Sequence, residues 1–195
     1  MIGNDIIDLR AAAIESRIHR KGFLEKLFLP AEISMIRNAA APAVLTWLLW
    51  SCKEAVYKIV HRNTRERRYA PLRFMCRVSI PEIGLPSSYS GTVLYQQQAY
   101  YFRSNITTDF IHTHAAITPQ LLSDAVVFTG QQLNSGYTAL LHEILSTDEV
   151  FYKDEDGIPY ILHHGDGRKQ PVSVSHHGEH CGIMRIRNKR IDIFT

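Results

Sequence analysis

The chain has 195 residues, of which 45% are hydrophobic and 21% are charged, an ordinary composition for a soluble globular protein. It excludes a disordered chain, which would need fewer apolar residues and more net charge. A formal net charge of +3 favours anionic ligands only weakly. The three cysteines are widely spaced and form no C-x-x-C pair, which excludes a disulfide framework and a zinc ribbon.

We expect neither a secretory signal nor a membrane anchor from this sequence. Asp5 and Asp8 stand where a signal peptide would need basic and then apolar residues. The longest apolar run, residues 39–50, contains Pro42 and is too short to cross a bilayer. Together with the unpaired cysteines, these features predict a cytoplasmic protein with no membrane partner.

The first half of the chain begins as a strand and continues as helices. Residues 2–9 are apolar apart from two acids and predict a strand, and residues 10–38 predict short helices, one of them starting at Pro30. A long helix is expected from Pro42 to about His61, because its apolar residues recur with a helical period.

Strand-like segments dominate the rest of the chain. After an arginine-rich loop, the pattern predicts an antiparallel sheet from residues 74–80, 91–95, 100–103 and 110–117. A similar layout follows from residue 118, with a helix at 137–145 and strands at 150–153, 158–162, 171–175 and 182–187, the last paired with 190–194. The sequence therefore predicts an α+β fold of two pseudo-symmetric lobes, 1–118 and 119–195, or a single domain 1–195.

Acidic and basic residues suited to a metal and a phosphate fall on the strand and the long helix. On that helix Trp50, Glu54 and Lys58 share one face, with Lys53 beside them, and Asp5 lies near the end of the first predicted strand. Magnesium uses few protein carboxylates and completes its shell with water and phosphates, so Asp5 and Glu54 suit it. The alternative is a surface ion pair between Glu54 and Lys58, with Asp5 ending a strand or capping a helix.

Two further segments could bind an anion. Ser175 and His176 follow an alternating strand and could hold a phosphate; the alternatives are a solvated histidine-rich loop and a zinc site with His177 and His180. The arginines of residues 62–68 favour phosphate through bidentate bonds. The same loop could instead contact nucleic acid or form a solvated face, but no basic stripe or nucleic-acid-binding motif accompanies it.

Taken together, these residues resemble the 4'-phosphopantetheinyl transferase superfamily, in its holo-acyl-carrier-protein synthase form. Residues 50–58 match the family helix Trp-Ser-x-Lys-Glu-Ala-x-x-Lys at every fixed position, and Gly3-Asn4-Asp5-Ile6 matches the Gly-x-Asp-Ile strand. Gly157-Ile158-Pro159 and Ser175-His176 stand for the less specific Gly-Lys-Pro and Ser-His motifs. The acid-bearing half comes first, so the resemblance implies two lobes in permuted order, or one lobe with a long insertion.

The resemblance implies transfer of the 4'-phosphopantetheine arm of coenzyme A to a serine of an apo acyl- or peptidyl-carrier protein, for example in fatty acid biosynthesis. Mg²⁺ would be held by Asp5 and Glu54, and the catalytic residues would be Glu54 and Lys58. Coenzyme A would be bound by Lys53, Lys58, Ser175 and His176. The competing implication is a non-catalytic relative that binds a carrier protein or coenzyme A without transfer.

The sequence departs from the family pattern at two places. Ile158 replaces the lysine of the Gly-Lys-Pro turn, so we expect Lys153, Lys169 or residues 65–68 to supply the missing charge. The second acid that long members carry two residues after the first is Ile7 here. Asp8, one residue further on, is expected to lie outside the metal site.

Overall fold

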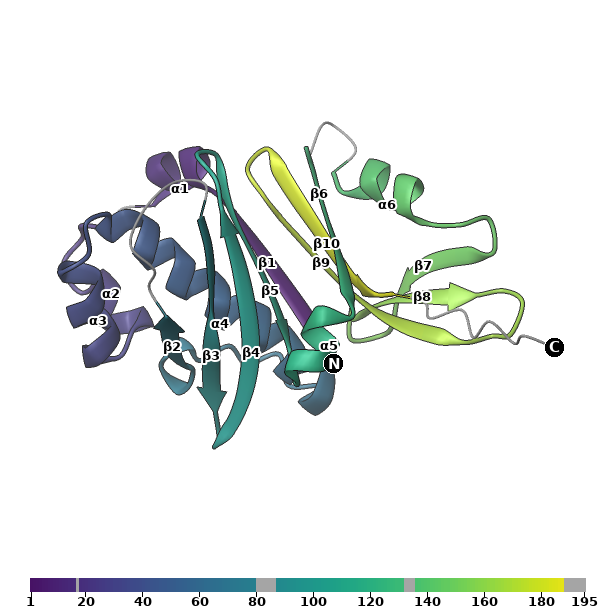
Figure 1. Ribbon diagram of the computed structural model, residues 1–195, viewed down its shortest axis with the longest axis horizontal. Coiled ribbons are helices and arrows are strands. Elements are labelled where there is room, and N and C mark those ends of the chain that lie inside the picture. Colours follow the sequence, from purple (N-terminus) through teal and green to yellow (C-terminus); the bar gives the residue numbers. More distant parts are fainter. Residues whose placement is uncertain (17, 80–86, 132–135, 188–195) are drawn as a thin grey trace.

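A five-stranded antiparallel sheet with the strand order β1-β5-β4-β3-β2 forms the first half of the molecule (Figure 1). The computed structural model describes residues 1–16, 18–79, 87–131 and 136–187. The strands of this sheet are β1 (Ile2–Asp8), β2 (Met75–Ser79), β3 (Ser87–Tyr95), β4 (Gln98–Ile106) and β5 (Phe110–Ala116).

Helices between β1 and β2 cover one face of this sheet (Figure 1). They are α1 (Leu9–Glu15), α2 (Phe23–Leu27), α3 (Pro30–Arg37) and α4 (Pro42–Thr64), followed by a 3-10 turn η1 (Pro71–Arg73). The apolar stripe of α4, including Leu48, Val56 and Ile59, is fully buried against the sheet in the main core. No helix in the described part of the chain is long and apolar enough to cross a membrane.

The second half repeats this layout with a smaller helix. Its sheet has the order β6-β10-β9-β8-β7, the same topology as the first sheet. The elements are α5 (Pro119–Ser123), β6 (Ala125–Gln131), α6 (Thr138–Ile144), β7 (Glu149–Lys153), β8 (Pro159–His163), β9 (Lys169–His177) and β10 (His180–Ile186). The predicted α+β fold of two pseudo-symmetric units is confirmed, although α6 has 7 residues where α4 has 23. The division into lobes at residue 118 stays a prediction.

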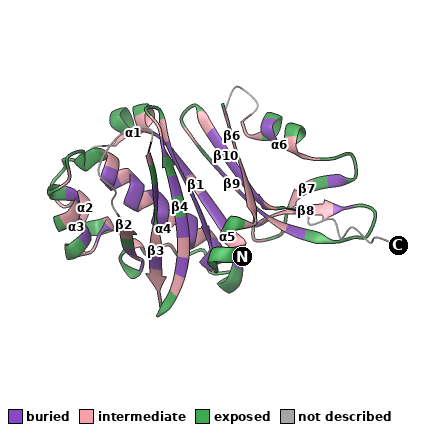
Figure 2. Ribbon diagram, in the orientation of Figure 1, coloured by how far each residue is buried: buried purple, intermediate pink, exposed green. Residues whose placement is uncertain are grey.

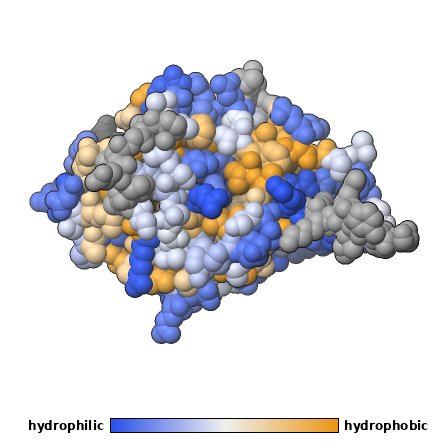
Figure 3. Space-filling model, viewed as in Figure 1, coloured by the Kyte–Doolittle hydropathy of each residue, from blue (hydrophilic) through white to orange (hydrophobic). Residues whose placement is uncertain are grey.

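Strand β6 was not predicted from the sequence. Val126, Val127 and Phe128 are β-branched or aromatic, which is typical of a strand, and all three are half-buried. Figure 3 shows hydrophobic residues gathered around this strand. The predicted strand 190–194 lies outside the described residues, and β10 pairs instead with β9 and β6.

A close approach between β1 and α4 fixes their relative position. A Cβ atom added at Gly3 would lie 2.0 Å from the carbonyl oxygen of Ala55, so only glycine fits at this contact. The buried residues in Figure 2 follow β1 and the sheet-facing side of α4. The contact places the residues after Gly3 beside the second half of α4.

β1 also joins the two sheets through polar contacts. The backbone N–H of Asn4 donates to Ser173 Oγ at 2.9 Å, and its side-chain amide donates to Ser175 Oγ at 2.9 Å. At the end of the strand, the N–H of Asp8 donates to His177 Nδ1 at 3.0 Å. β9 therefore lies along β1 by side-chain contacts, outside the ladder of the first sheet.

Lys53 forms an ion pair that is wholly inside the first lobe. Its side chain is 0% exposed, and Nζ donates to Glu32 Oε2 at 2.7 Å and to the carbonyl oxygens of Leu27 and Pro71. Glu32 accepts a further bond from the N–H of Cys76. The pair ties α4 to α2, α3, η1 and β2, with all three ammonium protons used.

We expect Lys53→Met to lower the free energy of unfolding by about 3–5 kcal/mol, because it leaves the Glu32 carboxylate buried without its cation. Urea denaturation of the purified variant measures this loss. The double variant Lys53→Met/Glu32→Gln should recover part of it, since no buried charge is left. A Lys53→Met protein as stable as the wild type would contradict this structural role.

A second buried pair predicts how stability depends on acid. Arg185 donates two bonds to the Glu149 carboxylate, which lowers the pKa of Glu149 to about 2. A carboxyl with a lowered pKa stabilises the fold above its unfolded pKa of about 4.3, and this contribution disappears as the pH falls through the folded value. The free energy of unfolding of the wild type should therefore exceed that of Glu149→Gln by about 2 kcal/mol at pH 6. This difference should shrink as the pH falls toward 2. Paired urea titrations across this range test it; a gap independent of pH would contradict it.

Candidate active site

Two carboxylates lie where β1 crosses α4. The sequence predicted Asp5 near the end of a strand, but it is in the middle of β1. Glu54 is in the middle of α4. Burial raises the pKa of Asp5, an effect that Lys58 offsets only in part. Burial and the neighbouring charge of Asp5 raise the pKa of Glu54 to about 7. The two carboxylates therefore lie close enough to repel each other.

This environment suits a divalent cation. The Asp5 Oδ2 atom is buried and has no hydrogen-bond partner among the described residues. A cation would supply that partner and remove the repulsion between Asp5 and Glu54. The described residues contain no cluster of three or more histidine, cysteine or acidic side chains that could hold a metal. Two carboxylates are enough for Mg²⁺ where water and substrate phosphates complete its shell.

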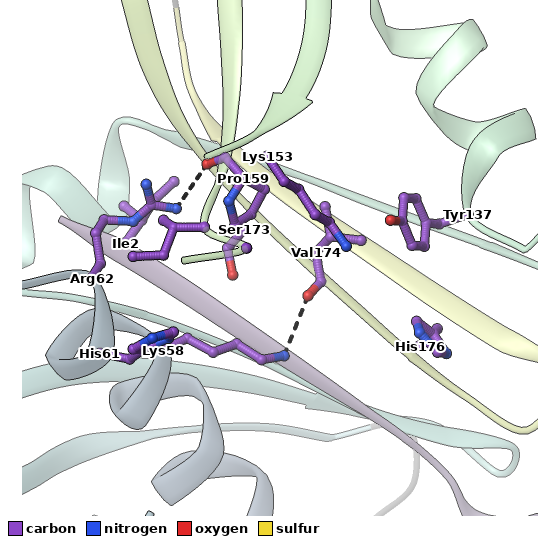
Figure 4. Close-up of a pocket in the computed structure, with 12 residues that line it drawn as sticks. Ile2, Lys58, His61, Arg62, Tyr137, Lys153, Pro159, Ser173, Val174 and His176 are labelled. Atoms are coloured by element: carbon purple, nitrogen blue, oxygen red, sulfur yellow. Dashed lines mark hydrogen bonds between the residues drawn. The ribbon is translucent and has the colours of Figure 1, made fainter. Parts of the chain in front are cut away.

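Lys58 lies one turn after Glu54 and connects the two halves of the molecule. Its Nζ atom donates to the carbonyl oxygen of Asn4 at 2.7 Å and to that of Val174 at 3.3 Å, and it lies 3.4 Å from Asp5 Oδ1. Figure 4 shows the ammonium reaching toward β9. The predicted grouping of Asp5, Glu54 and Lys58 is therefore present, with Lys58 bound to backbone from both sheets.

A basic pocket opens beside Lys58 between the two halves. Its basic lining residues are Lys58, His61 and Arg62 from α4, Lys153 from β7 and His176 from β9. No aspartate or glutamate occurs among the described residues that line it. Its volume of about 190 Å³ is smaller than the roughly 300 Å³ lower bound for drug-sized ligands, so it suits a phosphate-bearing part of a larger molecule.

Tyr137 organises the far side of this pocket. Its ring stacks on His176 with centroids 5.9 Å apart, and Lys153 Nζ lies 5.5 Å from the ring centroid on a cation–π contact. In Figure 4 the Lys153 ammonium, Tyr137 and His176 lie together on the side that the Lys58 ammonium faces. Basic side chains from α4, β7 and β9 thus meet around one space.

The turn before β8 forms another wall. Gly157 and Pro159 line the pocket, and Arg62 donates to the carbonyl oxygen of Pro159 at 3.0 Å. Ile158 also contributes to the wall but is only 3% exposed. This aliphatic side chain supplies no charge to the pocket.

Of the cations expected to compensate for Ile158, Lys153 is the one that lines the pocket. Arg65 instead pairs with Asp154 at 2.5 Å and with Asp156 at 3.1 Å. Lys169 lies over the ring of Tyr152.

Two sequence-predicted binding residues are placed elsewhere. Lys53 is buried in its pair with Glu32, so the predicted contact with coenzyme A phosphates does not agree with the structure. Ser175 is also buried and accepts a bond from the Asn4 amide, whereas His176 lines the pocket. Adjacent side chains of a strand point to opposite faces, which agrees with Ser175 facing Asn4 and His176 facing the pocket.

The other candidates near β1 have structural roles. Asp8 caps α1, since its Oδ1 accepts from two backbone N–H groups of that helix, and its Oδ2 accepts from the N–H of Glu179. This agrees with its expected place outside the metal site. His177 accepts a backbone bond from Asp8 and faces Glu15, away from a shared site with His176.

Sequence reasoning missed Asn4 and Tyr137. Asn4 stands at the variable position of the Gly-x-Asp motif, and its carbonyl group holds Lys58. The one feature of the sequence that could have pointed to Asn4 is its position next to Asp5. Tyr137 precedes α6 and belongs to no motif, so only the tertiary structure connects it with His176.

Comparison with known proteins places this geometry in a family. The sequence model of the 4'-phosphopantetheinyl transferase superfamily matches residues 1–115 of the 195. That match contains Asp5, Glu54 and Lys58. No curated protein matches the chain. Because the matched region covers more than half of the chain, the protein belongs to the 4'-phosphopantetheinyl transferase superfamily.

Proposed function

We propose that this protein transfers the 4'-phosphopantetheine arm of coenzyme A to a serine hydroxyl of an apo acyl- or peptidyl-carrier protein. The observation that carries the proposal is the joining of two repelling carboxylates, Asp5 and Glu54, to a basic pocket through Lys58. Family membership supports phosphopantetheinyl transfer in general. The holo-acyl-carrier-protein synthase type, the carrier's pathway and a cytoplasmic location remain part of the proposal.

In the proposed reaction the serine oxygen forms a bond to the phosphorus that carries the pantetheine arm. The bond from that phosphorus to the bridging oxygen breaks, and adenosine 3',5'-bisphosphate leaves. Asp5 and Glu54 would hold Mg²⁺ beside the pyrophosphate. When bound, the ion supplies Lewis-acid chemistry that neutralises charge developing on the phosphate oxygens.

Lys58 and Glu54 are the groups able to move protons at this site. The bonds from Lys58 to Val174 and Asp5 are long, at 3.3 and 3.4 Å, so a phosphate oxygen could replace either of them. The raised pKa of Glu54 applies to the site without a cation; with Mg²⁺ held by Asp5 and Glu54, the Glu54 carboxylate would be ionised and could accept the proton that serine loses. Both groups would lie on the same side of the reacting phosphate, because they are one turn apart on α4.

The basic pocket would bind the phosphates at the nucleotide end of coenzyme A. Lys153 and His176 approach it from the second half of the chain, and Lys58 approaches from the first. Donor binding would then require both halves. Arg62 adds buried N–H groups, at Nε and Nη1, that have no partner among the described residues.

The competing function is a non-catalytic relative that binds a carrier protein or coenzyme A. A protein that only binds has no need for two half-buried carboxylates that repel each other. Intact mass spectrometry of an apo carrier protein, incubated with coenzyme A, Mg²⁺ and this protein, separates the two functions. Transfer adds one phosphopantetheine group to the carrier, and binding alone adds nothing.

Asp5→Asn and Glu54→Gln should each lower the rate of that mass increase by about 100-fold or more, as expected when one charge-stabilising group is lost. Both substitutions keep size and remove charge, so the fold should persist or become more stable. Circular dichroism melting is the control for folding. Near wild-type turnover in either folded variant, at saturating Mg²⁺, would contradict the assignment of the two carboxylates.

Lys153→Met should raise the Michaelis constant for coenzyme A several-fold, and less so for dephospho-coenzyme A, which lacks the 3'-phosphate. The Michaelis constant for coenzyme A should also depend less on salt concentration in the variant than in the wild type. Lys169→Met is the matched control, because Lys169 Nζ also lies 5.5 Å from a tyrosine centroid but does not line the pocket. Equal effects of the two substitutions would show that Lys153 does not bind the 3'-phosphate of coenzyme A.

A further inference from the structure

Tyr69, in the segment between α4 and η1, lies over the side of α4 that carries Glu54. Its ring makes an edge contact with Trp50, with centroids 5.5 Å apart, and a tilted contact with Tyr57 at 4.7 Å. Trp50 and Tyr57 are about two helical turns apart, and Glu54 lies between them on the same side of the helix. A ring that contacts both therefore passes across the position of Glu54.

The hydroxyl of Tyr69 is buried and has no hydrogen-bond partner among the described residues. A buried hydroxyl without a partner destabilises a fold, and removing it can even be favourable. Burial raises the pKa of Tyr69 first, and the negative charges of Glu54 and Asp5 raise it further. The phenol is therefore close to the two carboxylates, with one O–H to donate.

Tyr57 does not share this environment. Partial burial and then the charge of Glu54 raise its pKa, but its hydroxyl is not a buried atom without a partner, as that of Tyr69 is. Tyr152, in the second half of the chain, has the same kind of buried hydroxyl without a partner in the described part of the chain. Its ring stacks on that of Tyr160, with centroids 5.6 Å apart. Tyr57 is thus near Glu54 without a buried unpaired hydroxyl, and Tyr152 has such a hydroxyl away from Glu54. Tyr69 combines the two properties.

We propose that Tyr69 is a positioning residue whose hydroxyl donates a hydrogen bond to the Glu54 carboxylate when that carboxylate binds a divalent cation. Ligating carboxylates are commonly held by such bonds, and their loss weakens metal binding by about 10- to 100-fold. A donated O–H fixes which oxygen of Glu54 faces the ion and favours its ionised form. This inference rests on the proposed metal-dependent function.

The test is calorimetric titration of the purified protein with MgCl₂, without coenzyme A, for wild type, Tyr69→Phe and Tyr152→Phe. Tyr69→Phe keeps the ring contacts with Trp50 and Tyr57 and removes only the hydroxyl. It should weaken Mg²⁺ binding about tenfold or more. Its melting temperature in EDTA should equal or exceed that of wild type. Tyr152→Phe should leave Mg²⁺ affinity unchanged.

The outcomes separate this inference from the proposed function. Equal Mg²⁺ affinity in wild type and Tyr69→Phe would overturn the role of Tyr69 and leave the metal site in place. Equal weakening in Tyr69→Phe and Tyr152→Phe would also overturn it, since the effect would then be general. Wild type that binds no Mg²⁺ would overturn both the role of Tyr69 and the metal part of the function. Loss of affinity confined to Tyr69→Phe supports the proposal.

Discussion

The hydrogen bonds that surround Asn4 hold together both the fold and the candidate site. One backbone group of Asn4 donates to Ser173 on β9, the other accepts from Lys58 on α4, and the side-chain amide reaches Ser175 and His112. β1 is thus bound to α4 on one side and to β9 on another. Any shift of β1 relative to β9 would also move Asp5 relative to the pocket.

The side-chain bonds that Asn4 makes at this interface join neutral groups. Burial lowers the pKa of His112 to about 3, so its ring is neutral at physiological pH and bonds with Asn4 and Thr129. Gly182 leaves room for that ring, since a Cβ atom there would lie 2.5 Å from His112 Nε2. Directional bonds between neutral groups specify one alignment of the two sheets, whereas an apolar contact would tolerate sliding. The grouping of acids from one half with cations from both depends on that alignment.

The sequence was informative wherever a local period determines the outcome. Helical spacing correctly put Glu54 and Lys58 on one side of α4, and the strand-like runs led to most of the observed strands. The sequence was misleading for residues adjacent to a site residue, because the side chains of consecutive residues point about 100° apart on a helix and about 180° apart on a strand. Lys53 and Ser175 consequently face the interior, with partners far away in sequence.

Tertiary contacts decided the remaining features. The partner of Lys53 is Glu32 on α3, and no spacing rule links the two. The choice among Lys153, Lys169 and the arginine loop likewise depended on which segment the turn at residues 157–159 approaches. β6 carried its strand signal in the β-branched and aromatic residues 126–128.

The helix motif of residues 50–58 divides its positions between two duties. Ser51 bonds with Thr113 inside the core, Lys53 neutralises Glu32, and Ala55 admits the backbone of β1 at Gly3. Only Glu54 and Lys58 reach the candidate site. Most positions of the motif therefore indicate the fold and not the chemistry. A relative could lose its activity through substitutions at Glu54 and Lys58 and still match the rest of the motif. Assigning activity within such a family by motif resemblance requires weighing these two positions apart from the rest.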